Sequence, residues 1–130
     1  IKTEGLTTIW FATGNSSAKT KDFRSNPKAG ICFYKEGNSV AMTGEVEVVS
    51  DTGTKKELWQ DWFIHHFPKG PEDPEYILLK FRGNHATIWI DGQFVHRKVL
   101  SFHLLSLDFF TFYFSYTSVI LETSYYIWMF

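Results

Sequence analysis

The sequence predicts an α+β fold in which a mainly antiparallel β-barrel carries two helices. Short runs of β-branched and aromatic residues recur along the chain, and Gly, Asn and Pro separate them, as expected of strands. Two other segments begin with Ser, Thr or Asp residues that can cap a helix. Most links between the predicted strands are too short for a parallel crossover, so neighbouring strands must run antiparallel.

The first half of the chain predicts one helix and three strands. Ser16 or Ser17 can cap a helix that runs to about residue 25, and Asn26-Pro27 then ends it. The strands are predicted at residues 6–12, 29–34 and 40–49, and a turn at residues 35–38 joins the last two.

The second half predicts another helix and three more strands. Asp51-Thr52 begins the helix, and Pro68, Pro71 and Pro74 end it and form a stiff loop. Its large side chains fall on one helical face, namely Leu58, Trp59, Trp62, Phe63 and His66. The strands are predicted at residues 76–81, 86–90 and 94–95, with Asp91-Gly92 as a two-residue hairpin turn between the last two.

A change in composition near residue 99 divides the chain into two parts. Residues 100–130 hold nearly half of the aromatic residues but only two charged ones, Asp108 and Glu122. We therefore predict a barrel domain at residues 1–99 and an aromatic-rich tail of unassigned structure at residues 100–130. A membrane-spanning helix within the tail is not favoured, because Asp108 near its middle would cost about 3 kcal/mol.

The overall chemistry argues against several kinds of partner. Thirteen Lys and Arg residues against fourteen Asp and Glu residues give a net charge of −1, which does not favour binding to nucleic acid. The single cysteine, Cys32, cannot form an internal disulfide, which agrees with a cytoplasmic protein. His65 and His66 would point about 100° apart on a helix, so no metal site is predicted.

The turn between the first strand and the first helix carries residue types that bind phosphate. Backbone N–H groups in the first turn of a helix lack partners within the helix and lie at the positive end of its dipole. The hydroxyls of Thr13, Ser16 and Ser17 add neutral donors, and Lys19 adds a charged one. An ordinary capped helix with a lysine in solvent fits the same residues.

The stretch Trp10-Phe-Ala-Thr-Gly-Asn-Ser-Ser-Ala-Lys19 resembles the flavin phosphate clamp of the pyridoxamine 5′-phosphate oxidase-like split barrels. Later segments resemble the bacterial general stress protein branch of that family in the same order, at residues 26–27, 40–49, 57–62, 67–74, 76–81 and 85–92. The resemblance implies an FMN-binding split β-barrel in which Thr13, Ser17 and Lys19 hold the FMN phosphate. It also implies a homodimer in which Trp89 approaches the flavin from the partner subunit, although a tryptophan that packs within the barrel fits equally well.

Three functions follow from this resemblance. The first is an FMN-binding general stress protein with flavin-dependent oxidoreductase activity, and the second is a non-enzymatic protein that binds flavin or another phosphorylated ligand. Family members carry a helix and a β-hairpin before the position of Gly5, so residues 1–99 are predicted to be an incomplete domain, and a truncated non-functional relative is the third. The Arg-x-His substrate motif of true pyridoxamine 5′-phosphate oxidases is not evident, so that activity is not expected.

Overall fold

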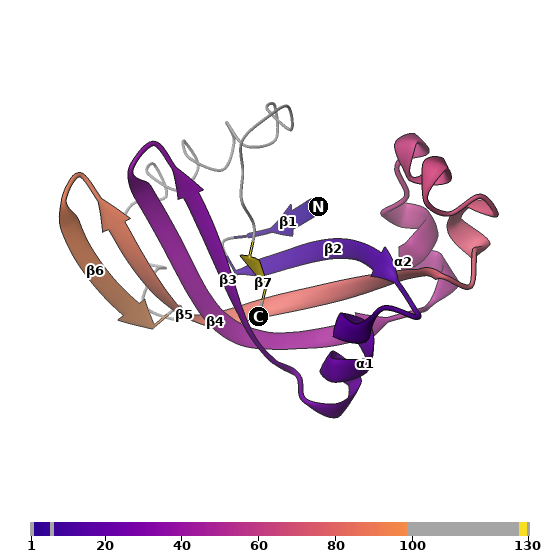
Figure 1. The fold of residues 1–130 in the computed structure, drawn as a ribbon, viewed down its shortest axis with the longest axis horizontal. Helices are drawn as coiled ribbons and strands as arrows, with labels where there is room; N and C mark the ends of the chain where they lie inside the picture. Colours follow the sequence, from indigo (N-terminus) through magenta and orange to yellow (C-terminus); the bar gives the residue numbers. More distant parts are fainter. Residues whose placement is uncertain (1, 6, 99–127, 130) are drawn as a thin grey trace. The chain divides into compact units, whose positions relative to one another are not determined.

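The computed structural model describes residues 2–5, 7–98 and 128–129 (Figure 1). The chain divides into two compact units. The first unit comprises residues 1–28 and 45–82, and the second comprises residues 29–44 and 83–130. The predicted tail at residues 100–130 lies outside the described residues except for Trp128 and Met129.

The described residues form one antiparallel sheet and several short helices. The strands are β1 (Lys2–Glu4), β2 (Thr8–Gly14), β3 (Lys28–Lys35), β4 (Asn38–Val49), β5 (Tyr76–Ile90), β6 (Gln93–Lys98) and β7 (Trp128–Met129). The helices are α1 (Ala18–Ser25), α2 (Thr52–Glu57) and the 3₁₀ turns η1 (Asp61–His65) and η2 (Gly70–Glu72). The order in the sheet is β1-β2-β5-β4-β3-β7, with β6 paired to β5, and no pairing among these described strands closes it into a ring.

The core of the first unit lies on both faces of the β2–β5 pair. These strands run antiparallel, and Ile9 lies opposite Phe81. Both side chains are at most 1% exposed. On the opposite face, an aromatic cluster contains Trp10, Phe63, Phe67, Tyr76 and Leu78. Burial of these large apolar side chains is the main force that holds the unit together.

The predicted second helix is wrong in its length. Asp51 caps α2 by accepting a 2.9 Å hydrogen bond from the Thr54 amide, as expected, but α2 ends at Glu57. The backbone at Gln60 is extended, and the chain resumes as η1. The break places Trp59 edge-to-face against both Phe63 and Tyr76, with ring centroids 5.6 and 5.2 Å apart. Aromatic packing on the sheet therefore outweighs the weak helix propensity of these residues.

The second unit contains two hairpins. The turn at Asp91-Gly92 joins β5 to β6, as predicted, and both of its residues have positive φ angles of 49° and 75°. Glu36 and Gly37 have positive φ at the turn between β3 and β4. The sequence predicted two strands where β5 is continuous, because Arg82 still pairs with β2 and His85 already pairs with β6.

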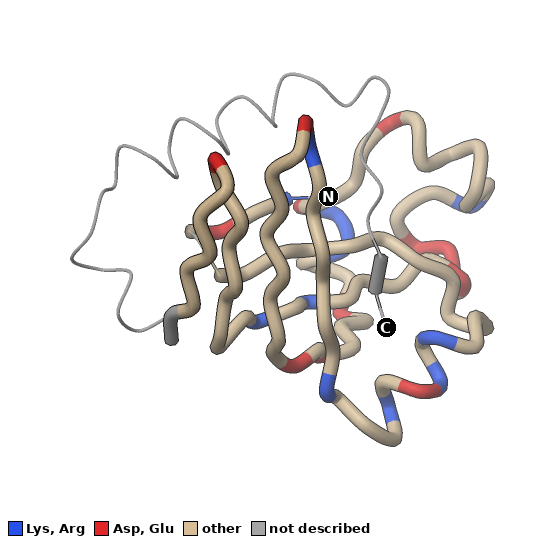
Figure 2. The backbone as a smooth tube through the Cα atoms, turned by 60° about the vertical axis from the view of Figure 1, so that its left-hand side comes forward, with Lys and Arg blue, Asp and Glu red and all other residues tan. Residues whose placement is uncertain are grey.

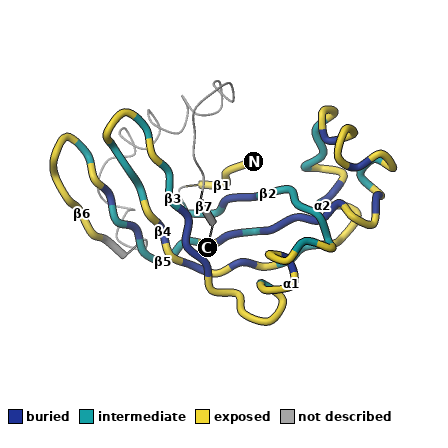
Figure 3. The backbone as a smooth tube through the Cα atoms, in the orientation of Figure 1, coloured by how far each residue is buried: buried dark blue, intermediate teal, exposed yellow. Residues whose placement is uncertain are grey.

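Burial along β4 alternates from residue to residue, as Figure 3 shows. Met42 and Val46 are buried, whereas Glu45 and Glu47 are exposed. Glu47 forms an exposed ion pair of 3.1 Å with Arg82. These two glutamates therefore lie on the solvated face of the strand. Among the described helices, none has the length and apolar character needed to cross a bilayer.

Candidate anion-binding site

The turn between β2 and α1 is built around a buried threonine. Thr20 is 0% exposed, and its hydroxyl donates a 2.9 Å hydrogen bond to the Gly14 carbonyl. The Ser17 hydroxyl lies 2.8 Å from the Thr20 hydroxyl and accepts a 3.3 Å bond from the Thr20 amide. Ser17 is thus the N-cap of α1, as one of the two predicted starts required. This network fixes the first turn of the helix against the end of β2.

Two backbone N–H groups at the start of α1 have no hydrogen-bond acceptor among the described residues. The Thr20 amide is satisfied by the N-cap, and the Ser17 amide donates to the Gly14 carbonyl at 3.2 Å. The amides of Ala18 and Lys19 have no acceptor within the described part of the chain. They lie at the positive end of the helix dipole, where an anion is stabilised.

The helix α1 carries three cationic side chains. Lys19, Lys21 and Arg24 are all exposed, and Figure 2 shows that α1 is rich in Lys and Arg. Arg24 donates to the side-chain oxygen of Asn15, which ties the helix back to the turn. The site is therefore open to solvent and carries more positive than negative charge along the helix.

Glu75 occupies part of the predicted site. Its carboxylate accepts a 2.7 Å bond from the Ser16 hydroxyl and a 3.1 Å bond from the Ser16 amide. These bonds, the hydroxyl first, hold the pKa of the Glu75 carboxyl below its usual value. The Asn15 amide also donates to the Glu75 carbonyl at 2.8 Å. The donors of Ser16, which the sequence predicts to face a ligand, are thus engaged with a carboxylate of the same chain.

The structure brings four of the five predicted site residues to one turn. Ser16, Ser17 and Lys19 surround the start of α1, and Thr13 is half-buried in β2 opposite Ile77. Trp89 belongs to the second unit, where it is 41% exposed and its ring centroid lies 6.1 Å from that of Phe94.

Sequence reasoning missed two residues of this turn. Thr20 lies three positions after the capping serine, a spacing that could have been recognised. Glu75 joins the turn across 59 positions in the chain, and no local pattern indicates such a contact.

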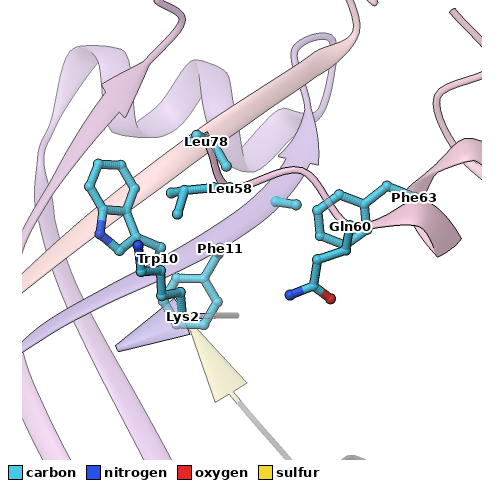
Figure 4. Close-up of a pocket in the computed structure, with 8 residues that line it drawn as sticks. Lys2, Trp10, Phe11, Leu58, Gln60, Phe63 and Leu78 are labelled. Carbon is cyan, nitrogen blue, oxygen red and sulfur yellow. The ribbon is translucent and has the colours of Figure 1, made fainter. Parts of the chain in front are cut away.

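A separate shallow cleft opens in the first unit beside the aromatic cluster (Figure 4). It is lined by the polar side chains of Lys2 and Gln60 and by six apolar residues, namely Trp10, Phe11, Ala12, Leu58, Phe63 and Leu78. None of the residues predicted to bind phosphate lines this cleft. The cleft is therefore distinct from the turn at the start of α1.

Comparison with known proteins assigns the family. The family described as pyridoxamine 5′-phosphate oxidase like matches residues 1–103. The chain belongs to this pyridoxamine 5′-phosphate oxidase-like family. A search of curated proteins finds no match.

Solved structures with the same fold include several general stress proteins. A protein from Clostridium acetobutylicum related to general stress protein 26 has a TM-score of 0.67 and 24% identity, over 77% of this chain and 72% of its own. General stress protein 26 from Bacillus anthracis has a TM-score of 0.59 and 23% identity, over 73% of each chain. A general stress FMN/FAD-binding protein from Xanthomonas citri has a TM-score of 0.59 and 20% identity, over 76% and 71%. The predicted α+β split-barrel fold is therefore confirmed for this pyridoxamine 5′-phosphate oxidase-like chain.

Proposed function

We propose that this chain binds FMN and that the phosphate of FMN lies at the start of α1. The observation that carries the proposal is the pair of unpartnered amides at Ala18 and Lys19 in the first turn of α1, where the Lys19 side chain is exposed. The solved relatives of this family include an FMN/FAD-binding protein. A phosphate dianion suits these groups because it accepts several hydrogen bonds and is attracted to the helix dipole.

Each residue of the turn has a distinct part in this proposal. The Ala18 and Lys19 amides donate to phosphate oxygens, and the Lys19 side chain supplies a charge-assisted bond. Ser16 donates to the same phosphate once the Glu75 carboxylate releases it. Thr13 contributes a hydroxyl from the end of β2, and Ser17 fixes the helix start rather than binding directly, because Thr20 already engages its hydroxyl. Bound FMN would supply the redox chemistry, whereas the chain supplies position and charge.

The remaining parts of the proposal concern assembly and activity. We propose a cytoplasmic homodimer of the general stress protein type, in which the exposed ring of Trp89 reaches the flavin held by the partner subunit. Flavin-dependent oxidoreductase activity and simple flavin binding are distinguished by adding NADPH to the FMN-loaded protein without oxygen. Loss of the flavin absorption bands indicates reduction, and unchanged bands favour a binding protein.

The phosphate position is tested by substitution of Lys19. Lys19→Ala should weaken FMN binding by about 1.5–3 kcal/mol, or roughly ten- to a hundredfold in Kd, because a charged hydrogen bond is lost. Quenching of flavin fluorescence during a titration measures this Kd. Lys28→Ala is the matched control, since Lys28 is also exposed and lies outside the helix.

Riboflavin, which lacks the phosphate, provides the second control. It should bind wild type more weakly than FMN does and should be indifferent to Lys19→Ala. The proposal is wrong if the Lys19 and Lys28 variants bind FMN equally well, or if wild type binds riboflavin as tightly as FMN.

A further inference from the structure

An acidic side chain of the protein itself lies at the start of α1. Glu75 directs one carboxylate oxygen to both the amide and the hydroxyl of Ser16, at 3.1 and 2.7 Å. These are the two donors that precede the N-cap, immediately before the unpartnered amides of Ala18 and Lys19. A bound phosphate would therefore have a negatively charged neighbour at this turn.

We propose that Glu75 is an internal competitor that limits the affinity of this turn for phosphorylated ligands. The inference rests on the proposed function, since it concerns the same turn. Phosphate and the Glu75 carboxylate repel each other and compete for the Ser16 donors, so phosphate binding requires the carboxylate to turn outward. Removal of its charge should then strengthen binding.

The contact is arranged so that the side chain can leave while the backbone stays. The Glu75 carbonyl accepts from the Asn15 amide at 2.8 Å, and its own amide donates to the Asp73 carboxylate at 2.9 Å. The backbone on both sides of the side chain is thus fixed. The side chain itself is exposed, so water can replace the Ser16 bonds when it turns outward.

Charges around Glu75 do not neutralise it. Among the described residues, no Lys or Arg forms an ion pair with Glu75, whereas Glu72, three residues earlier in the chain, is paired with Lys56 at 2.7 Å. The Asp73 carboxylate has the same sign and acts to raise the pKa of Glu75, against the stronger lowering by the Ser16 hydrogen bonds. Because the Glu75 carboxylate at this turn has no cationic partner in the part of the chain that the structure describes, the turn should bind anions less tightly than Lys19 and the free amides alone would allow.

The test is Glu75→Gln, which keeps an oxygen for Ser16 and removes the charge. Its Kd for FMN should fall by roughly three- to tenfold, since the carboxylate is exposed and its repulsion is partly screened. Glu45→Gln is the matched control: it removes one exposed carboxylate from β4, and its Kd should stay within about twofold of wild type. Riboflavin affinity should be unchanged in both variants, because riboflavin has no phosphate to repel. Thermal unfolding of each variant checks that the fold is retained.

The outcomes separate the inference from the proposed function. If Lys19→Ala weakens FMN binding but Glu75→Gln binds FMN no better than Glu45→Gln, the competitor role is wrong and the phosphate site stands. If Glu75→Gln binds FMN more weakly than wild type, Glu75 holds the turn in its binding form, and the inference is overturned. If wild type does not distinguish FMN from riboflavin, the phosphate site is wrong, and the inference is overturned with it.

Discussion

The two halves of β5 are surrounded very differently, although they belong to one strand (Figure 3). In the first unit, Tyr76, Ile77, Leu78, Leu79 and Phe81 are at most 2% exposed. In the second unit, burial alternates, and Ile88 is 8% exposed beside Trp89 at 41%. The first half is therefore covered on both faces, and the second half on one face only.

This difference is already present in the order of the residues. A strand buried on both faces has a continuous apolar run, as in Tyr76-Ile-Leu-Leu, whereas a half-buried strand alternates, as in His85-Ala-Thr-Ile-Trp-Ile. The register adds the partners: Leu79 lies opposite Phe11 on one face, and Leu78 lies opposite Ala12 on the other. The first unit thus has two packed layers around one strand, which gives the α1 turn a rigid support.

The largest expected effect is on stability, when one buried phenylalanine in the first unit and one exposed phenylalanine in the second are each replaced by alanine. Phe81→Ala should destabilise the protein by about 3–5 kcal/mol, because Phe81 is 0% exposed and its removal leaves a cavity. Phe94→Ala should cost only about 0.5–1 kcal/mol, because Phe94 is 66% exposed and loses mainly its contact with Trp89.

Urea denaturation followed by circular dichroism measures both costs. The contrast between the two units is wrong if the two phenylalanine variants lose similar amounts of stability. A large cost at Phe94 would mean that the exposed face of the β5–β6 hairpin is covered in solution.

How much of the fold the sequence predicted depends on the range of the interactions. The hairpin at Asp91-Gly92 was predicted correctly, and the cap expected at Ser16 or Ser17 is Ser17, because each depends on residues within a few positions. The helix expected to continue past Leu58 was wrong, because Trp59 is drawn to Tyr76, which lies in another element. At the candidate site, the sequence predicted the start of the helix correctly but did not predict the contact of Glu75 with Ser16. That contact joins residues 59 positions apart in the chain.

Acid is expected to act on the first unit through its hydrogen-bonded carboxylates. The pKa of Asp73 is lowered chiefly by the amides of Glu75 and then Lys69, and that of Asp51 is lowered by the Thr54 amide. A hydrogen bond from Lys56 lowers the pKa of Glu72, and hydrogen bonds from Ser16 lower the pKa of Glu75. Such groups stabilise the fold fully above their unfolded values, 3.8 for Asp and 4.5 for Glu, and lose this contribution as the pH falls through the lower folded values.

The Tm should therefore change little through these groups between about pH 7 and 5 and should fall below about pH 4.5. Asp73→Asn should lower the Tm at pH 7 and make it less dependent on acid, since Asn cannot ionise. Calorimetry at several pH values measures this. A wild-type Tm that stays constant down to about pH 3 would contradict the assignment.

The smallest expected effect on stability comes from replacing one tyrosine by phenylalanine in each unit. The Tyr76 hydroxyl is buried without a hydrogen-bond partner among the described residues, and burial raises its pKa to about 12. Tyr76→Phe should therefore stabilise the protein by up to about 1 kcal/mol, because an unsatisfied buried group is removed. Tyr34 is 53% exposed, and its hydroxyl accepts from the Gly37 amide at 3.2 Å, so Tyr34→Phe should cost about 0.5 kcal/mol or less.

Urea denaturation at pH 7 and near pH 11 distinguishes the two tyrosines. Because the folded pKa of Tyr76 exceeds the ordinary value of 10, the wild type should lose stability as the pH rises from 10 toward 12, and Tyr76→Phe should reduce that loss. Tyr34→Phe serves as the control for removal of one hydroxyl. Should Tyr76→Phe prove clearly less stable than wild type at pH 7, the hydroxyl must have a partner in solution, such as an internal water, and the first unit would be less tightly packed than its burial indicates.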